Sequence, residues 1–429
     1  MSTTKNRTVP IIMMIMLFGM ISFVTNIAAP MGIVLKSQFD VSNAMGMLGN
    51  MANFIAYAVM GIPGGLLLQR MGYKKTALIA VAVGLVGLFI QYLSGHVDLN
   101  SAFIVYIAGA FVAGFSMCLL NTVVNPMLNT LGGGGNKGNQ LIQIGGSFNS
   151  IMATLAPMFV GVMIGEVASA KITNVFPVLY TAMGIFAVIL VVLWIVDIPE
   201  PDTEKSSEPL GNLMAGALKF RHFILGAIGI FVYVGVEVGT PGLLLLFLPD
   251  SVANGGAGLD ASTAGFVAGT YWFLMLIGRL VGASIGGKVS SKTMLSVASI
   301  IALVLVICAI LSPITSSVSL PVLKSSATGM PSFGITSVPI AAMFLVIVGL
   351  CTSIMWGGIF NLAVEGLGKY TAVASGIFMT LVCGGGLLPA LQGFVADHVG
   401  YMASYWVVFA GFAYLLFYAL VGSKVTKRA

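Results

Sequence analysis

Charged residues are scarce in this sequence, and the scarcity limits the class of protein. Asp, Glu, Lys and Arg make up 7% of its 429 residues, whereas soluble domains carry about 25%. Apolar residues make up 58%, and the mean hydropathy is +1.04. The composition excludes a soluble domain of any size, and it also excludes a nucleic-acid-binding face, which would need its basic residues gathered on one soluble surface. It indicates a chain that lies in a lipid bilayer.

Residue patterns that build metal, disulfide or nucleophilic sites are also lacking. The four cysteines fall in apolar segments without metal-ligand spacing, so we expect reduced packing residues. The three histidines fall at loops or helix ends, with no nucleophile or acid pattern around them. The glycine-rich segment Gly132–Gly138 lacks the Gly-Lys-Ser/Thr end of a phosphate loop. We therefore predict no metal, no cofactor and no enzymatic activity.

Long apolar runs recur along the whole chain, and each can cross a hydrocarbon core of about 30 Å. The first run begins near Pro10, is too long for a signal-peptide core and lacks a cleavage site, so we expect it to remain as a helix. The pattern predicts an all-α integral membrane protein with twelve transmembrane helices, at residues 10–36, 45–69, 76–95, 101–128, 140–165, 175–197, 221–248, 262–287, 292–312, 337–363, 371–396 and 401–423.

Basic residues alternate with these spans in a way that predicts orientation. With both termini inside, sixteen Lys and Arg fall in cytoplasmic segments and three fall outside, which is a strong positive-inside bias. The outer three are Lys36, Lys171 and Lys324. We expect a multi-pass protein of the inner (plasma) membrane with cytoplasmic termini, and a monomer.

A hydrophilic segment rich in Pro and acids, residues 197–212, divides the chain into two halves of six helices. We predict an N-terminal half at 1–198, a cytoplasmic linker at 199–216 and a C-terminal half at 217–429. The two halves contain similar segments: Gly64–Lys75 and Gly278–Lys292 both combine glycines with basic residues after a predicted helix. Such a parallel repeat is the major facilitator arrangement, with the solute site between the halves.

Glu237 is the one carboxylate of thirteen that lies deep inside an apolar run, residues 223–248. An ionisable side chain at this depth costs about 3 kcal/mol on insertion scales, so it marks a functional site by default. A structural role is the alternative, in which a protonated Glu237 bonds to Tyr233 one helical turn away. For a protein that moves a solute with a cation, Glu237 is the expected coupling residue.

Four segments in order carry a specific resemblance: Tyr233–Gly242, Gly278–Gly282, Phe360–Gly376 and Gly384–Gly400. Together they resemble the fucose–galactose–glucose/proton symporter family of sugar permeases, over nearly the whole chain. The resemblance implies the major facilitator fold, a sugar as substrate and alternating access of one central site to the two sides of the membrane.

The loop after the second predicted helix is similar to the major facilitator loop motif, except that Gln69 stands at the place of the usual acid. The resemblance implies conformational gating roles for its glycine and basic residues and for the matching segment of the second half. These candidates are Gly65, Arg70, Gly72, Lys74, Gly278 and Arg279.

The N-terminal half departs from the family at its acidic positions. Asn26 and Asn121 stand where members carry an acid in helix one and a glutamate in helix four, and Gly146 stands at the place of a glutamine before Asn149. Asparagine can bond a hydroxyl group but cannot titrate. Coupling through those two positions is therefore not expected, which leaves Glu237.

A sugar site needs amides and carboxylates for the hydroxyl groups and aromatic faces for the ring. The alternative for each amide is a hydrogen bond between helices, worth about 0.6 kcal/mol, and Trp272 and Trp356 could equally face lipid. The substrate-binding candidates are Asn26, Asn121, Asn125, Gln143, Asn149, Tyr233, Glu237, Tyr271, Trp272, Trp356, Asn361 and Gln392.

The sequence thus predicts a secondary active transporter that imports a hexose, deoxyhexose, amino sugar or small disaccharide, coupled to a proton. The alternatives are a sugar uniporter, a sodium-coupled sugar symporter and, less favoured, a drug/proton antiporter. An acidic sugar is disfavoured because no Lys or Arg is expected deep in the helices, Arg279 near a helix end being the nearest.

Overall fold

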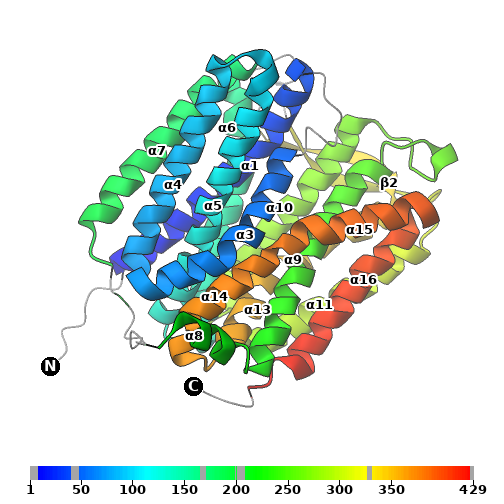
Figure 1. Cartoon of the computed structure of the whole chain (residues 1–429). Helices are drawn as coiled ribbons and strands as arrows, with labels where there is room; N and C mark the ends of the chain where they lie inside the picture. Colours follow the sequence, from blue (N-terminus) through cyan, green and yellow to red (C-terminus); the bar gives the residue numbers. More distant parts are fainter. Residues whose placement is uncertain are drawn as a thin grey trace.

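The computed structural model describes residues 8–39, 48–164, 171–198, 200, 208–325 and 331–425. Long helices fill this part of the chain and run side by side between two ends of the molecule (Figure 1). The predicted helical membrane bundle is therefore confirmed. The predicted site residue Asn26 has a side chain that lies outside the described residues.

The first half of the chain contributes six long helices to the described structure. Two 3-10 turns, η1 (Ser94–His96) and η3 (Ile172–Val175), adjoin them. The helices are α1 (Thr8–Phe39), α3 (Leu48–Met71), α4 (Tyr73–Leu93), α5 (Leu99–Leu131), α6 (Gly135–Ile164) and α7 (Phe176–Ile195).

The second half begins with a short helix and contains two spans that are interrupted in their middle. The short turns are η4 (Val252–Asn254), η5 (Gly368–Tyr370) and η6 (Leu381–Cys383), and η7 (Tyr418–Gly422) is a π-helical end. The helices are α8 (Leu210–Ala217), α9 (Arg221–Phe247), α10 (Ala261–Ile285), α11 (Ser291–Leu311), α12 (Ile340–Thr352), α13 (Met355–Val364), α14 (Thr371–Thr380), α15 (Gly384–Val399) and α16 (Tyr401–Phe417).

Eleven candidate membrane spans are found among the described residues, by length and apolar composition. The segments α12 and α13 share one span, and α14 and α15 share another. The remaining long helix is α6, whose 30 residues extend over about 45 Å. Its described side chains include several amides, which lower the apolar character by which spans are identified. The twelve predicted segments correspond to these eleven spans and α6, with ends displaced by a few residues.

A β-hairpin between α11 and α12 was not predicted. Strand β1 (Ser317–Ser325) pairs antiparallel with β2 (Pro331–Pro339), where the sequence analysis expected a loop and the start of the tenth helix. The physical signal is alternation: Val322 is fully buried, whereas Phe333 and Ile335 are 68% and 73% exposed. Three prolines also prevent a helix across this stretch.

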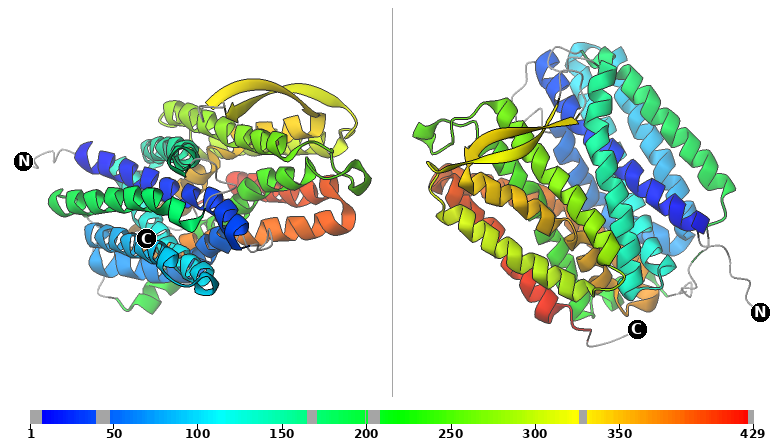
Figure 2. Two further views of the ribbon diagram at one scale, coloured as in Figure 1. Left: turned by 90° about the horizontal axis from the view of Figure 1, so that it is seen from above. Right: turned by 180° about the vertical axis from the view of Figure 1, so that it is seen from behind.

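The hairpin lies against the outside of α10 (Figure 2). The Leu323 N–H donates a hydrogen bond to Thr270 Oγ1 of α10 at 2.9 Å, and the Phe333 ring packs edge-on against Phe273. The hairpin is thus fixed to the second half of the chain.

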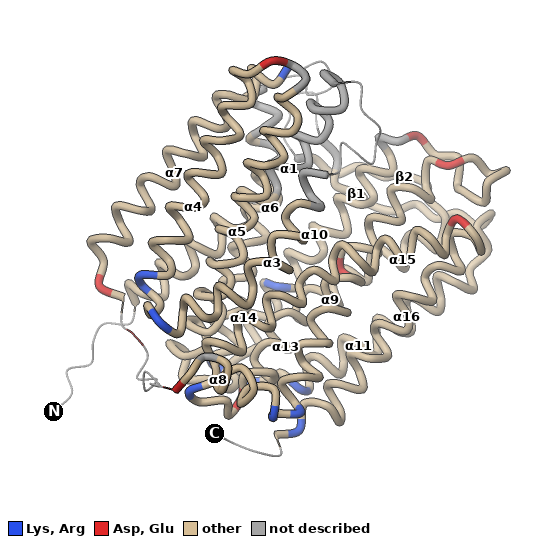
Figure 3. The backbone as a smooth tube through the Cα atoms, viewed as in Figure 1, with Lys and Arg blue, Asp and Glu red and all other residues tan. Residues whose placement is uncertain are grey.

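Lysine and arginine gather at one end of the bundle, here called the basic end (Figure 3). Helix α1 begins and η7 ends at this end (Figure 1). The described residues there include Arg70, Lys74, Lys75, Lys137, Lys219, Arg221, Lys288, Lys292, Lys369 and Lys424.

The acidic linker contacts both halves at the basic end. The Glu200 carboxylate accepts hydrogen bonds from the backbone N–H groups of Tyr73 and Lys74 at 2.7 and 3.1 Å, so it caps the first turn of α4. Glu208 forms an ion pair with Lys369 of the second half. The division of the chain at this linker stays a prediction.

The halves touch each other closely toward the basic end. A Cβ added to Gly65 of α3 would lie 2.7 Å from the Gly376 Cα of α14, so the two backbones are almost in contact. Asn129 Nδ2 donates to Asn361 Oδ1 across the same boundary at 2.6 Å. Gln140 Nε2 donates to the Ala283 carbonyl at 3.0 Å.

We predict that Gly87→Val destabilises the first half. A Cβ at Gly87 of α4 would lie 2.5–3.0 Å from the Ala113 backbone and Cβ of α5, and overpacking of this kind costs about 1–3 kcal/mol. Thermal unfolding of the detergent-purified protein should begin at a lower temperature.

Gly184→Val in α7 is the matched control, because a Cβ there meets nothing within 4 Å. Equal thermal stability of the two variants would contradict the close packing of α4 on α5.

Candidate functional site

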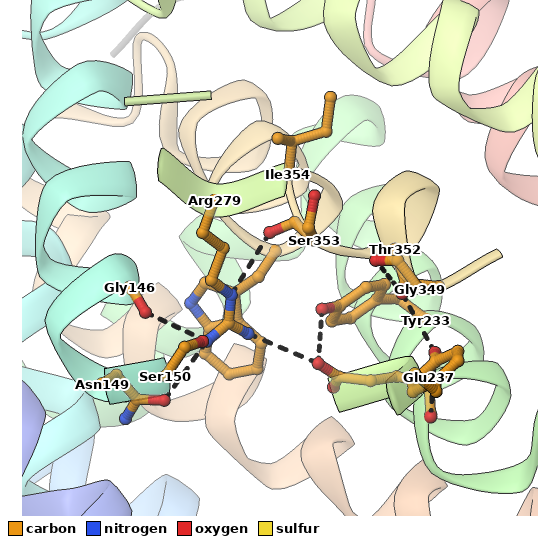
Figure 4. Close-up of polar contacts among 12 residues, drawn as sticks. Gly146, Asn149, Ser150, Tyr233, Glu237, Arg279, Gly349, Thr352, Ser353 and Ile354 are labelled. Carbon is orange, nitrogen blue, oxygen red and sulfur yellow. Dashed lines mark hydrogen bonds and ion pairs between the residues drawn. The ribbon is translucent and has the colours of Figure 1, made fainter. Parts of the chain in front are cut away.

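The site is built around Glu237 in the middle of α9. Its side chain is 12% exposed, and Tyr233 one turn earlier donates its hydroxyl hydrogen to Glu237 Oε1 at 2.8 Å. The expected contact between these two side chains is thus present. In Figure 4 the Glu237 carboxyl group points toward the Arg279 side chain of α10.

Arg279 pairs with this carboxylate, which corrects the expectation that no cation lies deep in the helices. Arg279 Nη2 is 3.4 Å from Glu237 Oε1, and both side chains are 12% exposed. Arg279 precedes the basic end of α10 by six residues, but helical side chains point toward the N-terminus of their helix. Its long side chain therefore extends away from the basic end, to the level of Glu237.

The same guanidinium group also binds the first half of the chain. Arg279 Nη1 lies 2.7 Å from Ser150 Oγ, 3.1 Å from the Gly146 carbonyl oxygen and 3.3 Å from Asn149 Oδ1, all on α6 (Figure 4). Arginine is suited to this because its five N–H groups form a rigid fork. One side chain therefore links α6 of the first half with α9 of the second.

A break between α12 and α13 supplies further acceptors at this place. Ser353 and Ile354 lie between the two helices, and their carbonyl groups accept hydrogen bonds from side chains, that of Ile354 in addition to the Gly358 N–H at 3.3 Å. Arg279 Nε donates to the Ser353 carbonyl at 3.3 Å, and Gln143 Nε2 donates to the Ile354 carbonyl at 2.8 Å. Irregular backbone at membrane depth is tolerated where it lies inside the protein.

A series of hydrogen-bonded amide side chains in the first half extends to the same centre. Asn121 Nδ2 donates to Tyr57 Oη at 2.6 Å, and Asn125 Nδ2 donates to the Asn121 carbonyl at 2.9 Å. Trp356 of α13 donates its ring N–H to Asn125 Oδ1 at 2.9 Å, across the boundary between the halves. The Trp356 ring lies edge-on to Tyr233 with centroids 6.3 Å apart. Trp356 is thus an internal residue in the described structure.

Asn149 joins this centre, and Tyr271 lies beside it. Asn149 Nδ2 donates to the Phe18 carbonyl of α1 at 2.8 Å, while its Oδ1 accepts from Arg279. Tyr271 is fully buried and donates to the backbone carbonyl of Glu237 at 3.2 Å.

Three predicted residues lie apart from this centre. Asn361 is nearer the basic end, where its Nδ2 donates to Ser291 Oγ at 2.8 Å. Gln392 is buried against Gly239, which lies on a different face of α9 from Glu237. Trp272 is 42% exposed on the surface of α10.

The predicted gating residues occupy close contacts and turns. Gly72 has a φ of 83°, a value that favours glycine, in the turn between α3 and α4. Lys74 Nζ donates to the Trp194 carbonyl at 3.1 Å, and Arg70 is exposed at the end of α3. A Cβ on Gly278 would overlap the Ser353 side chain, so α10 passes close to the helix break.

Sequence reasoning missed Tyr57, Ser150 and Ser353 as members of the site. Ser150 could have been found from its place next to Asn149. Tyr57 and Ser353 could not, because their roles depend on partners that are distant in the sequence.

The central pair retains hydrogen-bonding capacity for a ligand. In the described part of the chain, both hydrogen bonds of the Glu237 carboxylate go to Oε1, and Arg279 Nη2 has only this partner. Oε2 can accept a hydrogen bond, and one Nη2 hydrogen can be donated. The described residues contain no group of three or more His, Cys, Asp or Glu that could hold a metal ion.

Comparison with known proteins assigns the family. The sequence pattern of the Major Facilitator Superfamily matches residues 11–389. The chain therefore belongs to the Major Facilitator Superfamily, as its two groups of helices predicted.

Named relatives agree with the resemblance seen in the sequence. The chain is similar to a glucose/galactose transporter of Brucella abortus biovar 1 (strain 9-941), with 29% identity over 99% of this chain and 96% of the relative. Its fold matches a crystal structure of the E. coli fucose:proton symporter FucP with a TM-score of 0.79, 17% identity and coverage of 98% and 100% of the two chains. A second FucP structure, in the outward conformation, matches with a TM-score of 0.77, 18% identity and coverage of 97% and 100%.

We predict that Arg279→Gln strongly destabilises the protein at alkaline pH. The substitution leaves the Glu237 carboxylate without its counter-ion, and breaking a buried pair costs about 3–5 kcal/mol. The double variant Glu237→Gln/Arg279→Gln should recover part of this loss, because no uncompensated charge remains. Thermal unfolding in detergent measures both effects.

Lys369→Gln provides the control, since its pair with Glu208 is exposed and exposed pairs contribute little. A single Arg279→Gln variant as stable as the unsubstituted protein would contradict a buried ion pair.

Proposed function

We propose that this protein imports a sugar by alternating access, coupled to a proton at Glu237. The observation that carries the proposal is the Glu237–Arg279 pair, which touches both halves of the molecule and, among the described residues, keeps a free acceptor and a free donor. Neighbouring hydroxyl groups of a sugar fit this combination, one hydrogen-bonded to Glu237 Oε2 and one accepting from Arg279 Nη2.

The substrate class follows from the chemistry of the site and from the relatives. The surrounding amides and Trp356 provide further hydrogen bonds and an aromatic surface. The relatives are named for glucose, galactose and fucose. These sugars support a neutral hexose or deoxyhexose as substrate; amino sugars and small disaccharides share the same hydroxyl chemistry.

Thermodynamic linkage explains how one pair could couple the two ligands. A proton on Glu237 removes its attraction for Arg279 and releases an N–H group, which a sugar hydroxyl can then accept. Because sugar binds better to the protonated form, the proton binds better when sugar is present. The first half offers Asn121 at the family's acidic position, so it supplies no second titrating group there.

The orientation of the protein follows from its charges. We place the basic end in the cytoplasm because of the positive-inside rule, with both termini on that side of the inner (plasma) membrane and the protein acting as a monomer. The contacts between the halves toward the basic end support a state that is closed to the cytoplasm, as in the outward conformation of FucP.

We predict that Glu237→Gln keeps sugar exchange but loses accumulation driven by a proton gradient. Glutamine retains the size and hydrogen-bonding capacity of glutamate but cannot titrate. Uptake of labelled glucose, galactose and fucose into proteoliposomes, with and without proton and sodium gradients, measures both activities.

Glu208→Gln is the matched control, because this glutamate is exposed at the basic end. Accumulation that survives in Glu237→Gln would exclude coupling through this residue. A response to sodium alone would favour a sodium symporter, and exchange without any gradient effect in the unsubstituted protein would favour a uniporter.

We also predict that a disulfide between cysteines at Asn129 and Asn361 stops transport. The two side chains are in contact across the boundary between the halves, and alternating access requires this boundary to open. In a background without the four native cysteines, oxidation should abolish uptake and reduction should restore it.

A pair at Tyr92 and Tyr180 provides the control, because these rings pack within the first half. Full uptake with a complete Asn129–Asn361 crosslink would contradict the opening of this boundary.

A further inference from the structure

Pro241 interrupts the hydrogen-bond pattern of α9 at the residue that forms the site. Proline has no N–H group, so the carbonyl of the residue four places earlier, Glu237, loses its helical donor. An unpaired carbonyl group at membrane depth costs several kcal/mol unless a neighbouring group satisfies it. The backbone of the coupling residue therefore depends on a donor from outside its own helix.

Tyr271 of α10 is that donor. Its hydroxyl group donates to the Glu237 carbonyl oxygen at 3.2 Å, and its side chain is fully buried. Thr352 Oγ1 lies 3.0 Å from the same hydroxyl group. When the single Tyr271 hydrogen is directed to Glu237, the Tyr271 oxygen can accept the Thr352 hydroxyl hydrogen, for which the Gly349 carbonyl oxygen at 3.2 Å is the other acceptor. The result is a hydrogen-bonded chain from Thr352 through Tyr271 to Glu237.

A second series of hydrogen bonds holds the Glu237 carboxyl group in the same way. Ser353, the neighbour of Thr352, accepts from Arg279 Nε, and Arg279 in turn binds Glu237 Oε1. Adjacent residues at the end of α12 thus hold both α10 side chains that bind Glu237, one at its backbone and one at its carboxylate. Gly349 allows this approach, because a Cβ there would lie 2.5 Å from the Tyr271 carbonyl oxygen.

We propose that Tyr271 is a positioning residue, supported by Thr352, which fixes the Glu237 backbone at the Pro241 interruption and thereby sets the place of the Glu237 carboxyl group beside Arg279. This replaces the expectation that Tyr271 binds sugar, since its hydroxyl group is buried and already has both partners. The inference rests on the proposed function of Glu237 as the coupling and sugar-binding residue.

Tyr405 of α16 provides a matched control. It is also fully buried, and its hydroxyl group donates to a backbone carbonyl of the same helix, that of Thr240, at 3.0 Å. Tyr405→Phe and Tyr271→Phe therefore remove the same atom and the same kind of bond. They differ in the carbonyl group that loses the bond: the Thr240 carbonyl keeps the helical N–H of Leu244, whereas the Glu237 carbonyl faces Pro241, which has none.

The test uses the purified full-length protein and does not depend on the identity of the sugar. Infrared difference spectra between acid and alkaline pH contain a carboxyl band from Glu237, identified as the band that Glu237→Gln removes. Tyr271→Phe and Thr352→Val are expected to shift this band, because the carboxyl group loses its fixed place between Tyr233 and Arg279. Tyr405→Phe is expected to leave the band unchanged.

A second measurement connects position with function. In proteoliposomes loaded with glucose, galactose or fucose, Tyr271→Phe should raise the KM for exchange about tenfold, the effect of losing one hydrogen bond, with a maximal rate within about twofold. In a Glu237→Ala background, which has no polar side chain to position, the same substitution should have no further effect on KM.

The outcomes separate the two proposals. A Glu237 band that is unchanged in both Tyr271→Phe and Thr352→Val, or equally shifted in Tyr405→Phe, overturns the positioning role. A Tyr271→Phe effect on KM that persists in Glu237→Ala also overturns it. Absence of sugar exchange in the unsubstituted protein would refute the proposed function, while the infrared result would still decide the role of Tyr271.

Discussion

The hydrogen-bond acceptors that the buried Arg279 side chain requires determine how the centre of this structure is arranged. A guanidinium group at membrane depth is costly unless several acceptors bind it. Arg279 finds them on three sides: a carboxylate on α9, a carbonyl group at the break between α12 and α13, and three oxygens on α6. The helix break, the polar face of α6 and the depth of Glu237 all meet this single requirement.

The arrangement of amides in the first half follows the same logic with neutral groups. Asn121 and Asn125 bond to each other and to aromatic N–H and O–H groups, so their polar atoms have partners without any charge. A neutral half therefore faces a half that carries the ion pair. Among the described residues, protonation of the Glu237 carboxylate would change the net charge of the second half.

The helical architecture could be predicted because it is local: long apolar runs and basic ends define it, and the predicted span 221–248 matches α9 (Arg221–Phe247). The helix break after Thr352 could not be predicted, because neither Ser353 nor Ile354 is a proline or a glycine, the residues that usually indicate a break. The hairpin was not predicted because the alternation of two nine-residue strands is a weak sequence signal beside long apolar helices. The position of Arg279 in the sequence suggested a helix end, but the length and direction of its side chain place its charge at Glu237.

Residue types at the site were predicted better than their partners. Asn125 and Trp356 were each identified as candidates, but their hydrogen bond joins residues that are 231 positions apart. Tyr57 and Ser353 have no distinguishing sequence context, and only the packing of the halves gives them a role.

The polar face of α6 has a consequence for the order of folding during synthesis. Its Gln140 and Gln143 donate to carbonyl groups of Ala283 and Ile354, which are made after the whole first half has been synthesised. Until then these amides have no such partners, and unpaired amides hold a helix in the bilayer poorly. These two hydrogen bonds of α6 therefore form only after the second half has been synthesised, whereas the packing of α6 on α1 lies within the first half.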